Sequence, residues 1–181
     1  MLGMLLKEVA VVDDVLHRHA PAIGRDFTAY RNHVYRVLNI CVEMSDAHAE
    51  SVDKIAIAAV FHDLGIWTDR TFDYLGPSVR LAHEYLVEAG KAGWSPEVSA
   101  MILDHHKVTP HRGAPGPLVE PFRRADWIDV TRGIRRFGVP RRTLAPIFAA
   151  WPSAGFHWRL VELTFERFRS HPLTPLPMVK L

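Results

Sequence analysis

The sequence has very little cysteine: Cys41 is the one cysteine among its 181 residues. A single thiol excludes a disulfide scaffold and any zinc site built on cysteine. No apolar run approaches the roughly 18 residues that a membrane-spanning helix needs. The N-terminal apolar residues also lack the basic region of a signal peptide. We therefore expect a cytoplasmic protein with no membrane partner.

Alternation of apolar and polar residues, the pattern of a half-buried strand, is also missing over any useful length, and there are no internal repeats. Apolar residues instead recur at steps of three and four. This pattern predicts helices over residues 5–18, 26–47, 51–64, 77–89, 95–107, 119–134, 140–150 and 156–170. The length suits one domain. We predict an all-α single domain in which residues 1–25 pack on a core of residues 26–135, and residues 136–181, helices and a proline-rich tail, complete it.

Charge is unevenly distributed around a net value of +2. Residues 1–104 hold 9 Lys and Arg against 15 Asp and Glu, whereas residues 105–181 hold 13 against 5. The densest basic cluster consists of Arg132, Arg135, Arg136, Arg141 and Arg142. Two interpretations stay open for it, a solvated surface or a contact with phosphate groups. No nucleic-acid motif accompanies the cluster, so we do not expect a nucleic-acid partner.

Histidine is abundant, with 11 residues, and some histidines have an adjacent aspartate or histidine and apolar neighbours. His62-Asp63 and His105-His106 each end an apolar helical stretch, and Asp126 lies among apolar neighbours. An ionised aspartate in such surroundings is costly unless it is paired or binds a metal. The histidines that we interpret as ordinary core or surface residues are His17, His19, His48, His157 and His171.

The His62-Asp63 pair lies where a helix is expected to end, because Gly65 follows it. Adjacent helical residues diverge by about 100°, so both side chains reach one centre only if it lies beyond the helix end or if Asp63 bridges two metals. The negative end of the helix dipole favours a cation there. Imidazole and carboxylate ligands suit iron, manganese, cobalt, nickel or zinc.

The order of these residues resembles the H…HD…D signature of the HD-domain superfamily of metal-dependent phosphohydrolases. His33, His62-Asp63 and Asp126 follow one another at steps of 29, 1 and 63 residues, and the resemblance covers about residues 28–132. It implies an HD-type helical bundle. It also implies a set of metal ligands, with two metals as the first choice and one as the alternative: His33, His62, Asp63 and Asp126 for the first metal, Asp63 bridging, and His83 with His105, His106 or both for the second.

The resemblance implies hydrolysis of a small phosphorylated substrate, with a nucleotide among the candidates. A metal-bound water would be the nucleophile, and Asp63 or Asp126 could accept its proton. Lys107 is the preferred group to stabilise developing negative charge and bind substrate, although a lysine in a last helical turn also offsets the helix dipole. Further substrate-binding candidates on adjoining loops are Arg70, His111 and Arg112.

Three other functions stay open. Some HD proteins use two irons and dioxygen to cleave a C–C or C–P bond, and others hydrate a nitrile or cyanamide; residues 71–76 resemble the latter loosely. The third is a metal-holding module without turnover. The segment after His105-His106 lacks the Gly-Tyr-Pro of cyclic-dinucleotide phosphodiesterases, so that substrate is not expected. Trp151, Phe156 and Trp158 either pack in the core or form a contact surface for a homo-oligomer.

Overall fold

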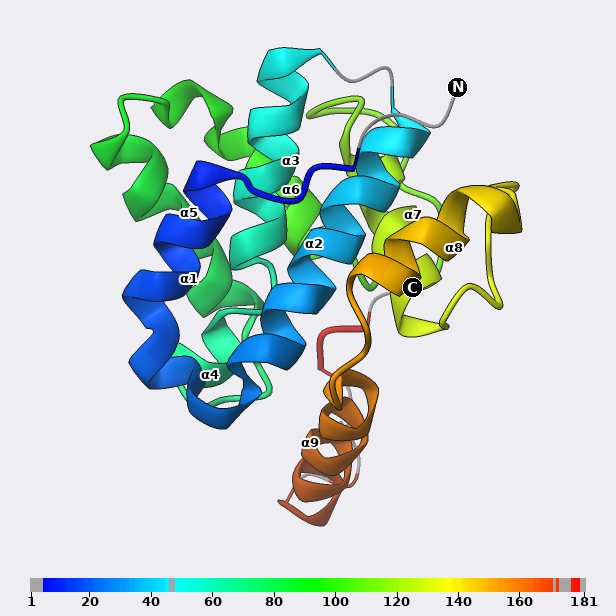
Figure 1. Ribbon diagram of the computed structural model, residues 1–181. Coiled ribbons are helices and arrows are strands. Elements are labelled where there is room, and N and C mark those ends of the chain that lie inside the picture. The colour runs from blue at the N-terminus through cyan, green and yellow to red at the C-terminus, as the bar shows by residue number, and fades with distance from the viewer. Residues whose placement is uncertain (1–4, 46–47, 171, 173–176, 180–181) are drawn as a thin grey trace.

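The computed structural model describes residues 5–45, 48–170, 172 and 177–179 (Figure 1). These residues form helices joined by loops, and none of them lies in a strand, which confirms the all-α prediction. Most of the predicted proline-rich tail lies outside the described residues. No helix in the described part of the chain combines the length and the apolar character that a membrane span needs. The elements in chain order are α1 (Ala10–Ile23), η1 (Gly24–Asp26), α2 (Phe27–Met44), α3 (Ala49–Phe61), α4 (Gly65–Thr68), α5 (Leu75–Glu88), η2 (Ala92–Trp94), α6 (Ser95–Asp104), α7 (Val119–Val130), α8 (Arg141–Ala150) and α9 (Phe156–Ser170).

Helix α2 forms the centre of the fold. It packs against α1, α3, α7 and α8, and it contacts the start of α9 (Figure 1). Apolar residues such as Val34, Val37 and Leu38 are fully buried along it, as an all-round buried helix requires. The same helix also buries polar side chains, namely Asn32, His33, Arg36 and Asn39. Buried polar groups on a core helix need partners, and their partners define the site described below.

Gly65 does not end a helix as the sequence suggests. Helix α3 already ends at Phe61, and Gly65 begins the short helix α4. The glycine is required by a close approach: a Cβ atom at this position would lie 2.7 Å from the Tyr74 carbonyl oxygen and 2.9 Å from Pro77 Cβ. Its amide donates a hydrogen bond to Ser78 Oγ at 3.1 Å. The start of α5 is therefore packed directly against the turn that follows α3.

The C-terminal segment covers one side of α2. Trp151 is buried and stacks on Tyr35 with the ring centroids 5.4 Å apart, and Phe156 is buried against His33. These two aromatics therefore pack in the core, whereas 68% of Trp158 is exposed.

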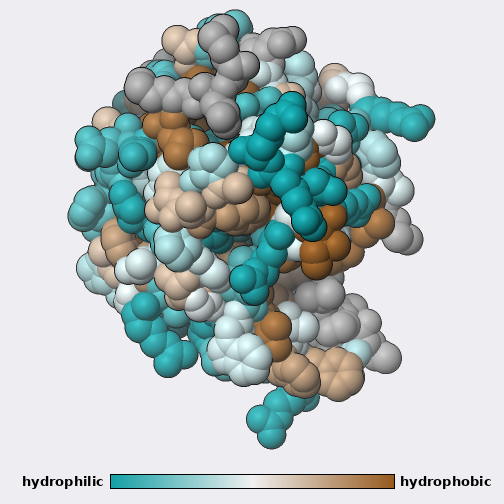
Figure 2. Space-filling view, turned by 45° about the vertical axis from the view of Figure 1, so that its right-hand side comes forward, coloured by the Kyte–Doolittle hydropathy of each residue, from teal (hydrophilic) through white to brown (hydrophobic). Residues whose placement is uncertain are grey.

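The space-filling view shows apolar side chains beside strongly hydrophilic ones on the face turned forward (Figure 2). The exposed apolar side chains of α9 are Trp158, Val161, Phe165 and Phe168.

Candidate metal centre

Six histidine and aspartate side chains from four parts of the chain converge beside α2. Helix α2 contributes one, the turn after α3 two, the turn after α6 two, and α7 one. They fall into three overlapping groups in which the possible ligand atoms all lie within 4.8 Å of one another. Five of the six are buried and the sixth is half-buried. The groups are His33, His62 and Asp126; His62, Asp63 and His105; and His105, His106 and Asp126.

Three of these histidines present the same ring nitrogen to the centre. His62 and His105 each donate from Nδ1 to the backbone carbonyl three residues earlier, at 2.7 and 2.6 Å. His33 donates from Nδ1 to Asp129 Oδ2 at 2.6 Å. In the neutral rings these bonds place the proton on Nδ1 and leave the Nε2 lone pair facing the centre, the arrangement that a metal ligand needs.

The carboxylates of Asp63 and Asp126 face these nitrogens, and three of their four oxygens have no hydrogen-bond partner. Asp63 Oδ1 and both oxygens of Asp126 are buried and accept no hydrogen bond. Asp63 Oδ2 lies 3.5 Å from His33 Nε2 and 3.4 Å from His62 Nε2. Buried carboxylate oxygens without partners are costly, and a bound cation would remove that cost. The nitrogen and oxygen donors fit a divalent transition metal.

Charge in the centre is divided unevenly between two neighbouring histidines. Burial lowers the pKa of His33, but hydrogen bonds to Asp129 and Asp63 outweigh burial and raise it to about 9. Burial lowers the pKa of His62 to about 4. At neutral pH and without a metal, His33 is therefore protonated and His62 is neutral. A cation bound at the His33 nitrogen would take the place of that proton.

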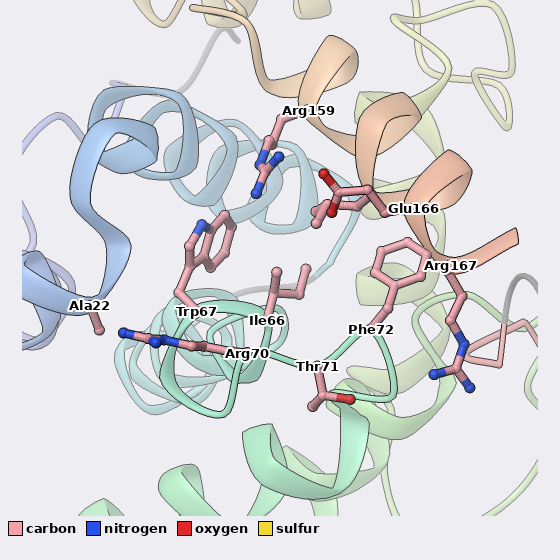
Figure 3. Close-up of a pocket in the computed structure, with 10 residues that line it drawn as sticks. Ala22, Ile66, Trp67, Arg70, Thr71, Phe72, Arg159, Glu166 and Arg167 are labelled. Atoms are coloured by element: carbon pink, nitrogen blue, oxygen red, sulfur yellow. The ribbon is translucent and has the colours of Figure 1, made fainter. Parts of the chain in front are cut away.

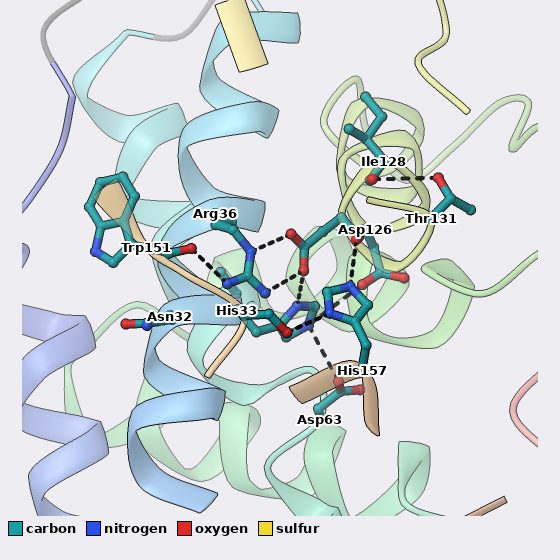
Figure 4. A network of polar contacts seen from close by, with 12 residues as sticks. Asn32, His33, Arg36, Asp63, Asp126, Ile128, Thr131, Trp151 and His157 are labelled. Carbon is teal, nitrogen blue, oxygen red and sulfur yellow. Dashed lines mark hydrogen bonds and ion pairs between the residues drawn. The ribbon is translucent and has the colours of Figure 1, made fainter. Parts of the chain in front are cut away.

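A buried Arg36–Asp129 pair supports His33 on the side away from the cluster. Figure 4 shows Arg36 and His33 within this network of polar contacts. Arg36 donates from Nε to Asp129 Oδ1 at 2.5 Å and from Nη2 to Asp129 Oδ2 at 2.9 Å. Its Nη1 donates to the Trp151 carbonyl oxygen at 3.0 Å. Burial raises the pKa of Asp129, but the hydrogen bonds from His33 and Arg36 outweigh it and lower the pKa to about 2. The ionised Asp129 thus fixes both the tautomer and the orientation of His33.

No role for either member of this pair was predicted from the sequence. Both could have been found from helical spacing, because Arg36 follows His33 by three residues and Asp129 follows Asp126 by three. Residues three apart lie on the same face of a helix. A buried charged residue on the face of a candidate ligand is the expected place for its orienting partner.

His83 does not join the cluster, although the sequence analysis expects it there. Its side chain is exposed on α5, and its Nδ1 lies 3.0 Å from Ser95 Oγ. The buried face of α5 instead presents Ser78 and Ala82. A residue directly after Ala82 is turned about 100° away from that face. Helix α5, expected to supply a ligand for a second metal, therefore places His83 outside the cluster.

His106 and Tyr74 form the outer edge of the cluster. His106 Nδ1 lies 3.3 Å from Asp126 Oδ2, and His106 Nε2 lies 3.0 Å from the Tyr74 hydroxyl. The same hydroxyl lies 3.4 Å from His105 Nε2. Burial, together with the charges of Asp63 and Asp126, raises the pKa of Tyr74 well above its ordinary value, so its hydroxyl stays protonated. Residues 71–76 were noted in the sequence only for a loose resemblance to the nitrile-hydrating proteins, and no role was predicted for this tyrosine.

The four candidates for substrate binding lie outside the cluster. His111 bonds from Nδ1 to Asp104 Oδ2 at 2.8 Å. Lys107 is half-buried, and its carbonyl oxygen accepts hydrogen bonds from Arg123 and Trp127 at 2.9 and 3.2 Å. The remaining two, Arg70 and Arg112, are exposed. These contacts anchor the loop that follows His106 to α7.

Arg70 lies at the edge of a cavity of about 480 Å³ between α4, the loop after it and α9 (Figure 3). The cavity wall includes Trp67 and Phe72, whereas Arg159 and Arg167 reach it from α9. The wall has mixed charge, because Glu166 also lines the cavity and Arg159 is paired with Asp26 and Glu162. Aromatic walls with a few polar groups suit a small ligand that has an apolar part. Ile66, which also lines the cavity, donates its amide to the Asp63 carbonyl oxygen at 3.0 Å, so the cavity borders the turn that carries the cluster.

Comparison with known families agrees with this geometry. The family model described as HD domain matches residues 30–131, which run from α2 to just past α7. The chain belongs to the HD-domain family. The matched HD segment contains all six cluster residues and the Arg36–Asp129 pair, but it ends before Trp151 and Phe156. No curated protein and no solved structure matches the chain.

Proposed function

We propose that this HD-domain protein is a metal-dependent hydrolase that cleaves a small phosphate ester. One observation carries the proposal: three buried carboxylate oxygens on Asp63 and Asp126 have no hydrogen bond and face imidazole nitrogens. Asp63 Oδ1 and Asp126 Oδ1 face Nε2 atoms, and Asp126 Oδ2 faces His106 Nδ1. A bound divalent metal would lower the pKa of a water molecule and polarise a phosphoryl oxygen. The family membership, which is that of metal-dependent phosphohydrolases in general, points to the same reaction type.

The proposed ligands of the metal are His33, His62, Asp63 and Asp126. The Nε2 atoms of His33 and His62 lie 2.9 Å apart, which is the separation of two nitrogen ligands at right angles about 2.1 Å from one ion. Asp63 Oδ1, free of hydrogen bonds and 3.4 Å from His105 Nε2, is the proposed acceptor of a proton from the nucleophilic water. We propose one tightly bound ion, because His83 on α5, the residue expected to help hold a second metal, lies outside the cluster.

The substrate is proposed to bind on the side of the cluster where His106 is half-buried. Lys107 and Arg112 lie on the loop next to His106, and Arg70 lies on the loop that leads to Tyr74. Their positive charges would attract a phosphate group, and the cavity beside Arg70 would hold an apolar part of the ester. A nucleotide has both parts and is therefore our first choice of substrate.

The proposal is tested by metal analysis and an ester assay on protein purified without a metal-binding tag. Generic phosphomonoesters, phosphodiesters and nucleotides are screened with added manganese, iron, cobalt, nickel or zinc. We expect one ion per chain and metal-dependent release of phosphate or alcohol. His62→Ala and Asp126→Ala should lose both, and His83→Ala, a histidine outside the cluster, is the matched control.

Three outcomes would contradict the proposal. A protein that binds no metal, or whose activity is unchanged in both variants, is not a metal-dependent hydrolase. Two irons with an oxygen-dependent spectral change and no ester cleavage would identify an oxygenase. Loss of the metal in His83→Ala would show that this exposed histidine is a ligand after all.

A further inference from the structure

The Tyr74 hydroxyl reaches two histidine side chains of the cluster. The tyrosine belongs to the loop between α4 and α5 and is 1% exposed. Its hydroxyl contacts His106 Nε2 at 3.0 Å and His105 Nε2 at 3.4 Å. The distance to His105 exceeds that of an ordinary hydrogen bond with a hydroxyl donor. Neither the proposed metal ligands nor the proposed substrate-binding arginines account for a hydroxyl at this position.

We propose that Tyr74 is a catalytic residue whose hydroxyl donates a hydrogen bond to a phosphoryl oxygen of the substrate bound at the centre. This inference rests on the proposed function, since it assumes that a phosphate group binds beside the six-residue cluster. Negative charge develops on the phosphoryl oxygens during transfer, and a fixed donor aimed at them stabilises the transition state.

The other buried tyrosines show what a structural hydroxyl looks like in this fold. Tyr30 donates to the Val60 carbonyl oxygen at 2.9 Å, and Tyr35 donates to Asp13 Oδ1 at 2.8 Å. Both bonds tie one helix to another element and need no ligand. The Tyr74 hydroxyl instead contacts two side chains of the candidate metal centre.

The loop that carries Tyr74 is held firmly. The Tyr74 carbonyl oxygen accepts the amide of Ser78 at 2.9 Å, and Ser78 Oγ accepts the amide of Gly65 at 3.1 Å. Gly65 follows Asp63 by two residues, so the same turn positions the carboxylate and the tyrosine. A donor that is fixed before the substrate arrives requires little reorganisation during the reaction.

The test compares Tyr74→Phe with Tyr35→Phe, which removes a hydroxyl that contacts no cluster residue. Each protein is loaded with the metal that the wild type binds most tightly. We measure metal stoichiometry, the affinity for inorganic phosphate by calorimetry, and kcat and KM for a generic phosphomonoester. Thermal unfolding monitored by circular dichroism establishes that both variants are folded.

We expect Tyr74→Phe to keep its metal, to bind phosphate about 10-fold more weakly and to lose about 100-fold in kcat, because removal of one donor to a charged oxygen has effects of this size. Tyr35→Phe should match the wild type in all three measurements. Phosphate affinity and kcat unchanged in Tyr74→Phe would overturn the inference, as would loss of the metal, which would make Tyr74 a part of the metal site itself.

The two proposals fail in different ways. A wild-type protein that binds metal and phosphate but cleaves no ester contradicts the proposed function, while the phosphate affinity of Tyr74→Phe still decides the role of the hydroxyl. A wild-type protein that binds metal and cleaves esters, with equal phosphate affinity and equal kcat in Tyr74→Phe, overturns the inference alone.

Discussion

The Nε2 atoms of His33 and His62 lie 2.9 Å apart, although the two residues are separated by 29 positions and belong to different segments. Both rings have their Nδ1 atoms engaged on the far side, one with Asp129 and one with the Ala59 carbonyl oxygen. Two imidazole nitrogens held this close in a buried site share either a proton or a cation. The protonated His33 is the first case, and a bound metal is the second.

Metal removal should lower the stability of the folded protein. A cation that binds only the native state stabilises it by about 2.7 kcal/mol when its concentration is 100 times the Kd. We therefore expect a chelator to lower the melting temperature of the wild type, and added metal to restore it. The His83→Ala variant should respond in the same way, whereas the melting temperature of His62→Ala should not respond to metal. An identical response in both variants would contradict the assignment of His62.

Replacement of Asp129 with asparagine should weaken metal binding without removing a ligand. Asp129 fixes the Nδ1–H of His33 and neutralises the buried Arg36. Loss of such an orienting partner lowers metal affinity by about 10-fold to 100-fold. Competition with a chelator of known affinity measures this change. Arg124→Gln, which alters a half-exposed arginine on the same helix, is the control, and equal metal affinity in both variants would remove Asp129 from the site.

Gly65→Ala and Gly76→Ala should have opposite effects on stability. A Cβ at position 65 would lie 2.7 Å from the Tyr74 carbonyl oxygen, so the start of α5 must shift, and overpacking of this kind costs about 2 kcal/mol. Gly76 lies in the first turn of α5 with no atom within 4 Å of an added Cβ, and alanine there should stabilise the helix by about 0.5 kcal/mol. Chemical denaturation gives both values. Equal stability of the two variants would contradict the close approach.

Glu120 should make a contribution to stability that depends on pH. Burial raises the pKa of Glu120, but hydrogen bonds from Arg123, Arg124 and the His111 amide outweigh it and lower the pKa from 4.5 to about 2. A lowered pKa in the folded state means that the stabilisation is complete above about pH 4.5 and is lost as the pH falls towards 2.

The comparison of wild type with Glu120→Gln tests this dependence. The difference in their free energies of unfolding should be constant between about pH 5 and pH 7 and should shrink as the pH falls from about 4.5 to 3. Urea denaturation at several pH values provides the measurement. A difference that grows on acidification would mean that the carboxylate is not stabilised by its arginine partners.

The sequence predicted the helical class and the family because the relevant signals are local. His62-Asp63, His105-His106 and Asp126 stand in apolar helical stretches where a buried charge needs a reason. The buried face of α5 could not be predicted in the same way. Apolar residues lie three and four positions after His83, but one apolar and one polar residue lie at the same spacings before it, so the sequence does not show which side of the helix faces the core. Only packing against α3, α4 and α6 decides which face of α5 is buried.

The role of Tyr74 depends on contacts between distant parts of the chain. The tyrosine reaches His106 because Gly65, at the start of α4, lets the start of α5 approach the turn after α3. Likewise, Phe156 stacks on His33 across more than a hundred residues, with ring centroids 4.0 Å apart. Neither contact leaves a periodic pattern in the sequence.

The candidate metal centre is supported by residues that lie outside the segment matched by the family model. Phe156 covers the ring of His33, and the Trp151 carbonyl oxygen accepts a hydrogen bond from Arg36, yet both residues lie after position 131, where the match ends. A shortened chain that stops there would expose a proposed ligand to water and leave a guanidinium proton without its acceptor. Transplanting the matched segment into another protein would therefore require helices α8 and α9 to be carried with it.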